Sequence, residues 1–134
     1  MELYNEDCIK ILSELPDNSI DLVLTDPPYG TIASKWDNVI PFDKIKDNLY
    51  RVLRPHGSIM LFASGLFVPR VMLFDEENYK YKYVWVKNKK GNFVHAKNRP
   101  MTQHEDILVF SKASMGHKSQ VKTECIMNLL DSLK

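Results

Sequence analysis

The chain has 134 residues, of which 44% are hydrophobic and 26% charged, and its formal net charge at pH 7 is +1. These values are typical of one globular domain with a single hydrophobic core, and they exclude an intrinsically disordered chain. Two cysteines exclude a disulfide framework, and no apolar run approaches the ~20 residues that a membrane-spanning helix needs. No secretory leader opens the chain, so we expect a cytoplasmic protein without membrane association.

The first part of the chain predicts a strand, a helix and a second strand. Residues 1–6 predict a short strand, and Asp7 is the expected N-cap of a helix over residues 8–15. The apolar run over residues 20–25 lies between turn residues, which is typical of a buried parallel strand. Residues 31–41 lack periodicity and predict a mobile loop, with an ordinary connector as the alternative.

The middle of the chain continues this alternation of helices and strands. Residues 42–53 carry apolar side chains at helical spacing, which predicts an amphipathic helix. A buried strand is expected over residues 58–63, and a helix over residues 65–75 that Pro69 bends or delays.

Two more strands are predicted over residues 79–87 and 106–110, separated by the polar stretch 88–103. A connection of that length is usually functional or disordered. Strands that alternate with helices predict an α/β fold, here a partial doubly wound (Rossmann-like) sheet. We expect this sheet to be mostly parallel, with an antiparallel strand pair at the end. Residues 119–134 have apolar side chains at helical spacing and predict a C-terminal amphipathic helix.

Basic residues are concentrated in one segment of the chain. Residues 80–104 carry seven basic residues and no acidic one, whereas residues 1–26 carry seven acidic residues and one basic one. A basic segment of this kind can neutralise nucleic-acid phosphates. It is also typical of a solvated hairpin whose lysines keep an exposed edge soluble.

The turn Asp26-Pro27-Pro28-Tyr29 follows the second predicted strand, where open α/β sheets bind their ligands. Two prolines lack N–H groups and fix φ, so the turn is stiff and its carbonyls can face a ligand. A carboxylate, a carbonyl and an aromatic ring together suit a planar heterocycle with an exocyclic amine, such as an extruded nucleobase. The alternative is a rigid turn in which Tyr29 only packs.

The chain resembles the catalytic part of S-adenosylmethionine-dependent DNA amino-methyltransferases in their permuted order, where the catalytic region precedes the cofactor loop. The matching segments are residues 3–8, 16–30, 53–58, 85–88 and 104–112. We therefore predict that residues 1–118 form the catalytic half of a methyltransferase domain. Residues 119–134 have no counterpart in this resemblance.

The resemblance implies the roles of the turn residues, with DNA as the substrate and S-adenosylmethionine as the cofactor. The target amine would donate hydrogen bonds to Asp26 and to the carbonyl of Pro27, and Tyr29 would stack on the flipped base. The implied catalytic residues are Asp26, Pro27, Pro28 and Tyr29. The implied cofactor contacts are Asp7, Cys8 and Asp26. In this family the aspartate form of the motif usually accompanies adenine N6 methylation and the serine form cytosine N4, which favours adenine here.

The same resemblance implies contacts to DNA that set affinity and register rather than sequence preference. The residues in question are Lys87, Asn88, Lys89, Lys90, Lys97, Asn98 and Arg99. His104 and Glu105 match a family position where hydrogen bonding around the site is expected rather than catalysis. The histidines and cysteines lack zinc-ligand spacing, so no metal site is expected.

The family's glycine-rich cofactor loop has no counterpart, because no two of the five glycines lie close enough together. We therefore expect a chain truncated to the catalytic half, with an apolar sheet edge that a homodimer or a separate chain would cover. A restriction-modification enzyme or a prophage remnant fits this expectation. One alternative is an inactive remnant with residual nucleic-acid or partner binding. Another is an RNA or protein-amide methyltransferase, although the basic segment argues against a protein substrate.

Overall fold

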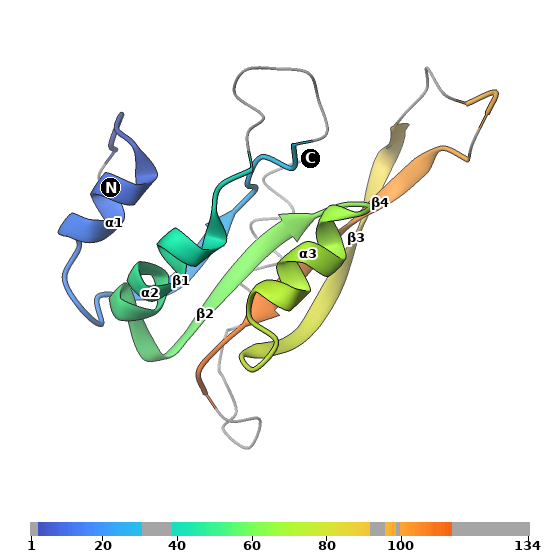
Figure 1. The fold of residues 1–134 in the computed structure, drawn as a ribbon. Helices are drawn as coiled ribbons and strands as arrows, with labels where there is room; N and C mark the ends of the chain where they lie inside the picture. The colour runs from blue at the N-terminus through green and yellow to red at the C-terminus, as the bar shows by residue number, and fades with distance from the viewer. Residues whose placement is uncertain (1–2, 31–38, 92–95, 99, 114–134) are drawn as a thin grey trace.

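The computed structural model describes residues 3–30, 39–91, 96–98 and 100–113, which fold into three helices and four strands (Figure 1). The elements are α1 (Cys8–Glu14), β1 (Ile20–Thr25), α2 (Phe42–Val52), β2 (Leu53–Ala63), α3 (Phe67–Phe74), β3 (Tyr79–Gly91) and β4 (Thr102–Phe110). Among these residues, no helix is long and apolar enough to cross a membrane.

The strands form one sheet in the order β1-β2-β4-β3. β1 is parallel to β2, whereas β4 is antiparallel to both of its neighbours, β2 and β3. β1, β2 and β3 therefore run in one direction, and β4 runs against them (Figure 1). The predicted α/β sheet with an antiparallel strand pair at its end is confirmed. β1 is at the edge of this sheet, and the homodimer or separate chain expected to cover that edge stays a prediction.

The N-terminal segment agrees with the prediction for the helix but not for the strand. Asp7 caps α1, because its Oδ1 accepts a hydrogen bond of 2.8 Å from the backbone N–H of Ile9. The strand predicted over residues 1–6 is wrong for residues 3–6, which are not strand. A strand needs a neighbour to satisfy its backbone groups, and among the described strands the sheet ends at β1.

The last two strands are longer than predicted. Residues 88–91 belong to β3 and residues 102–103 to β4, although the sequence predicted a connection over residues 88–103. The added residues are polar and mostly exposed, and such a ribbon has no apolar alternation that sequence patterns could detect. Residues 31–38 of the predicted loop and the whole predicted helix over residues 119–134 lie outside the described residues. The domain boundary at residue 118 stays a prediction.

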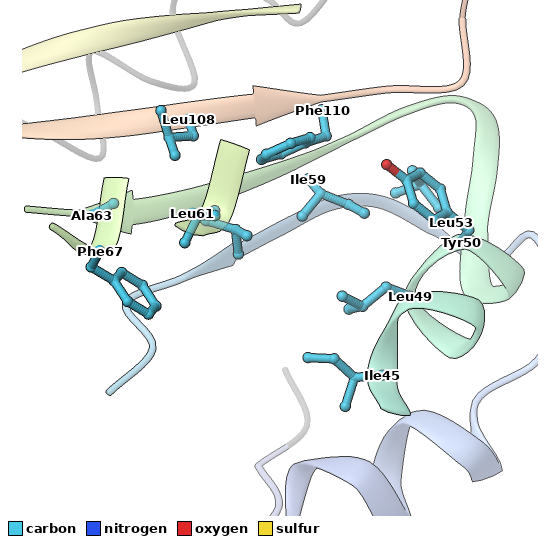
Figure 2. Close-up of a cluster of buried hydrophobic side chains, with 11 residues drawn as sticks. Ile45, Leu49, Tyr50, Leu53, Ile59, Leu61, Ala63, Phe67, Leu108 and Phe110 are labelled. Carbon is cyan, nitrogen blue, oxygen red and sulfur yellow. The ribbon is translucent and has the colours of Figure 1, made fainter. Parts of the chain in front are cut away.

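Two hydrophobic clusters lie on opposite faces of the sheet. On the face that we call the helix face, α2 and α3 pack against β2 and β4, and Figure 2 shows Leu49, Ile59 and Phe67 in this cluster. Leu12 of α1 packs against the same cluster, so all three described helices lie on this side. The opposite face, which we call the far face, has a cluster made only of strand residues. Its members are Met60, Phe62, Ile107 and Val109, with Leu22, Leu24 and Trp85 packed against them.

A buried carboxylate joins α2 to the end of α3. Asp75 is the C-cap of α3 and accepts hydrogen bonds from the Tyr50 hydroxyl, from Lys46 Nζ at 2.9 Å and from the Asn78 amide at 2.9 Å. Burial by itself would raise the pKa of Asp75, but these donors outweigh it and lower the pKa below its ordinary value. The network therefore holds an ionised side chain inside the helix layer.

Candidate functional site

The Asp-Pro-Pro-Tyr turn lies at the carboxyl end of β1, where the sequence placed it. Thr25 is the last residue of β1 and pairs with Leu61 in β2, which fixes the point where the chain leaves the sheet. Asp26 follows and is exposed, whereas Pro27 is buried. Gly30 follows the turn with φ of +66°, a conformation that residues with a Cβ atom rarely adopt.

The first and last residues of this turn are hydrogen-bonded to each other. The Tyr29 hydroxyl donates to Asp26 Oδ1 at 2.6 Å. Burial, the hydrogen bond to Asp26 and the negative charges of Asp26 and Glu105 raise the pKa of Tyr29 far above its ordinary value. The hydroxyl therefore stays protonated and holds the carboxylate of Asp26 in one orientation.

The ring of Tyr29 is supported from the hydrophobic core. It stacks on Phe67 of α3 with ring centroids 4.8 Å apart and an interplanar angle of 28°. Phe67 is 2% exposed and also contacts the ring of Phe42, with centroids 6.0 Å apart. One face of the Tyr29 ring is thereby occupied, so a flat ligand has to stack on the other face.

An apolar cavity of about 320 Å³ lies beside the turn, between α1, α2 and β1. Residues near the chain's start contribute Tyr4, Glu6 and Cys8, and the end of β1 contributes Thr25 and Pro27. Cys8, a predicted cofactor contact, lines this cavity, whereas Asp7 does not, and its carboxylate caps α1. Sequence reasoning missed Glu6, which lines the cavity; its place next to Asp7 was the available signal.

A second cavity of about 210 Å³ lies where β4 begins and the chain enters α3. Its lining comprises Ala63, Ser64, Gly65, Thr102, His104, Glu105 and Asp106. Asp106 is buried, and its Oδ2 accepts a hydrogen bond of 2.8 Å from Lys82 Nζ. Its Oδ1 has no hydrogen-bond partner in the part of the chain that the structure describes. The lining of this cavity is therefore mostly polar, and one carboxylate oxygen of Asp106 beside it is buried.

The predicted DNA contacts that the structure describes lie on or just beyond the ribbon formed by β3 and β4, which extends beyond the other two strands (Figure 1). Asn88, Lys89 and Lys90 are exposed on β3, and Lys97 and Asn98 are exposed in the turn beyond it. Arg99 lies outside the described residues. These side chains therefore share one projecting ribbon and are accessible to solvent.

Lys87 differs from the other predicted DNA contacts. Its ammonium forms an ion pair with Glu105 across the ribbon and lies 5.2 Å from the ring centroid of Trp85. The positive charge of Lys87 is therefore already balanced within the sheet. Among the described residues, no group of histidine, cysteine, aspartate and glutamate side chains could hold a metal ion.

A family model described as DNA methylase matches residues 20–125. The type II methyltransferase M.HpaI of Haemophilus parainfluenzae is 30% identical over 120 residues, which cover 82% of this chain and 38% of the relative. The type II methyltransferase M.BglII of Bacillus subtilis is 31% identical over 129 residues, which cover 83% of this chain and 35% of the relative. The chain thus spans well under half of the length of these two curated relatives.

Solved structures show a similar fold. The cytosine-N4-specific PvuII DNA methyltransferase superposes with a TM-score of 0.62 at 20% identity, over 82% of this chain and 48% of that protein. The M1.HpyAVI–SAM complex superposes with a TM-score of 0.57 at 24% identity, over 83% of this chain and 56% of that protein. In both, the similar region is about half of the solved protein.

Proposed function

Because the chain belongs to the DNA methylase family whose model matches it, we propose that it carries the base-binding and amine-orienting part of a DNA amino-methyltransferase. The observation that carries this proposal is the hydrogen-bonded pair of Asp26 and Tyr29 at the carboxyl end of β1. This pair combines an oriented acceptor with an aromatic surface that the core holds in place.

The turn would orient the amino group of the target base. The Tyr29 hydroxyl occupies one lone pair of Asp26 Oδ1, so the carboxylate orientation is set before the base arrives. The amine would then donate to Asp26 and to the carbonyl of Pro27, which draws the nitrogen lone pair out of the ring system. Orientation of this kind supplies at best about 7–11 kcal/mol of a reaction barrier.

Tyr29 would also hold the flipped base. Taking a base out of the helix costs a few kcal/mol, and stacking on an aromatic ring returns about 1–3 kcal/mol. Phe67 supports the ring from behind at a centroid distance of 4.8 Å, so little ring motion has to be frozen on binding. The two prolines also restrict the backbone of the turn, which further limits the motion that base binding has to freeze.

The residues around the apolar cavity fit the adenosine part of S-adenosylmethionine. Pockets for small ligands are mostly apolar, with volumes of about 300–1,000 Å³, and this cavity of about 320 Å³ lies next to Pro27. Glu6 offers a carboxylate that could accept hydrogen bonds from ribose hydroxyls, and Cys8 lines the same cavity. When bound, the cofactor supplies an electrophilic methyl group. The described residues hold no glycine-rich loop for its methionine part.

Adenine is the proposed target base, because the motif begins with Asp26, and the aspartate form of the motif usually accompanies adenine N6 methylation. DNA would be held by exposed lysines of the ribbon, with Lys89, Lys90 and Lys97 as phosphate contacts. Lys87 would contribute less, since Glu105 already balances its charge.

The test is a methyl-transfer assay with S-adenosylmethionine and DNA from a methylation-deficient bacterial strain, followed by nucleoside mass spectrometry. N6-methyladenine formed by the wild type but not by Asp26→Ala would support the proposal. N4-methylcytosine would overturn the choice of base. No methylated nucleoside would overturn the proposed activity of this chain and favour a remnant that transfers nothing.

A further inference from the structure

The helix that forms one wall of the apolar cavity is weakly attached by packing. α1 contributes Cys8, Ile11 and Leu12 to the cavity lining. All seven residues of α1 are described, and none of them is buried. Helices shorter than about 12 residues are only marginally stable in water by themselves. Contacts from outside α1 therefore have to hold this wall in place.

Arg51, near the end of α2, donates hydrogen bonds to the end of α1. Its Nη2 donates to the backbone oxygen of Leu12 at 2.6 Å, and its Nη1 donates to that of Leu15 at 2.8 Å. Nη1 also pairs with Asp17 Oδ1 at 2.5 Å, in the turn after α1. On the α2 side, Nε donates to Asn48 Oδ1 at 3.3 Å, which orients the guanidinium. One side chain thus joins the two helices that line the cavity.

These contacts supply what α1 lacks. The last carbonyls of a helix have no intrahelical donors, and the carboxyl end carries a partial negative charge. The last turn of α1 contains no basic residue, so the guanidinium of Arg51 provides both the donors and the positive charge. Arg51 does not line the cavity itself. Its effect on a ligand there would therefore act through the position of α1.

We propose that Arg51 is a positioning residue that holds α1 against α2 and so keeps the apolar cavity in the shape that binds the cofactor. The inference rests on the proposed function for the identity of the ligand, S-adenosylmethionine, but not for the attachment of α1. Without the guanidinium, α1 is in place in only a fraction of the chains, and the apparent dissociation constant of the ligand rises by the inverse of that fraction. Loss of a hydrogen bond from a charged group changes such an equilibrium about tenfold or more.

The test compares Arg51→Ala with Arg54→Ala in the full-length chain. Arg54 is the matched control, because its Nη1 pairs with Asp21 Oδ2 at 2.6 Å and its Nε donates to the backbone oxygen of Asn18, both outside α1. Backbone Cα chemical shifts of residues 8–14 measure the helix population of α1, and those of residues 58–63 in β2 report on the rest of the fold. Calorimetric titration measures the dissociation constant of S-adenosylmethionine for each variant.

In Arg51→Ala the α1 shifts should move toward random-coil values while the β2 shifts stay unchanged, and the dissociation constant should rise about tenfold. Saturating S-adenosylmethionine should return the α1 shifts to helical values, because binding selects the attached state. Arg54→Ala should change neither quantity. Unchanged α1 shifts in Arg51→Ala, an unchanged dissociation constant, or equal effects of the two variants would overturn the proposal.

Arg51→Lys keeps the positive charge and decides the question if Arg51→Ala does not fold. One ammonium cannot reproduce the planar fork that reaches two carbonyls and a carboxylate, so this variant should also bind the cofactor more weakly than the wild type. Binding as tight as that of the wild type would contradict the bridging role. A wild type that binds no S-adenosylmethionine would refute the proposed cofactor site, whereas the α1 shifts of the variants would still decide whether Arg51 anchors the helix.

Discussion

The Tyr29 hydroxyl donates a 2.6 Å hydrogen bond to Asp26 Oδ1, while the ring of the same residue stacks on Phe67 with centroids 4.8 Å apart. One side chain thus connects the exposed acceptor at the end of β1 to the core beneath α3. Its ring and its hydroxyl have separable roles, and substitutions can remove them one at a time.

Tyr29→Phe removes the hydroxyl and keeps the ring. A hydrogen bond to a charged group contributes about 1.5–3 kcal/mol, so we expect methyl transfer to fall about tenfold or more while DNA affinity stays near the wild-type value. Tyr29→Ala should additionally weaken binding of DNA with an unpaired target base, by about 1–3 kcal/mol of lost stacking. Rates and affinities measured side by side separate the two roles. Equal DNA affinities for Tyr29→Ala and Tyr29→Phe would contradict the stacking role.

Tyr50→Phe should make stability less sensitive to alkaline pH. Burial and the hydrogen bond to Asp75 raise the pKa of Tyr50 above its ordinary value, whereas in the unfolded chain it ionises near pH ~10. In the wild type, the protonated Tyr50 therefore stabilises the folded state fully below about pH 10, and this contribution to the free energy of unfolding is lost as the pH rises further. The variant lacks this ionisation and should lose less stability over the same range.

Urea unfolding at pH 8 and at pH 11 measures this difference. At pH 8 the variant should be less stable by about 1–3 kcal/mol, because the buried carboxylate of Asp75 loses one donor. A variant whose stability falls as steeply with pH as that of the wild type would rule out Tyr50 as the source.

Gly57→Ala should destabilise the sheet. A Cβ atom there would lie 2.7 Å from Leu53 Cδ1 and 2.9 Å from the backbone oxygen of Asp21, which is too close for either contact. Overpacking of this kind costs about 1–3 kcal/mol. Gly91→Ala is the matched control, because its nearest neighbour would be the oxygen of Thr102 at an ordinary 3.7 Å. Thermal unfolding should separate the two variants, and equal melting temperatures would refute the steric argument.

The double variant Lys89→Ala/Lys90→Ala should weaken DNA binding and its dependence on salt. If both lysines contact phosphates of a duplex, the slope of log K against log salt should decrease by about 1.8. Lys87→Ala should change this slope much less, because its ammonium already pairs with Glu105. Fluorescence anisotropy across a salt series gives the slopes. A larger change for Lys87→Ala than for the double variant would contradict the assignment.

The sequence by itself determined the elements whose signals are local. The Asp7 cap, the strand Ile20–Thr25 and the turn after it depend on neighbouring residues, and the structure places them as expected. The family could be identified for the same reason, since its motifs are short runs whose order along the chain is visible without a fold.

Tertiary structure alone decided the features that depend on residues distant in the chain. The extent of β3 and β4 follows from pairing with each other, because their polar ends carry no periodic signal. The stacking of Tyr29 on Phe67 and the ion pair of Lys87 with Glu105 join residues 38 and 18 positions apart. Such contacts arise only when the sheet brings its strands together, and no local pattern records which side chains then meet.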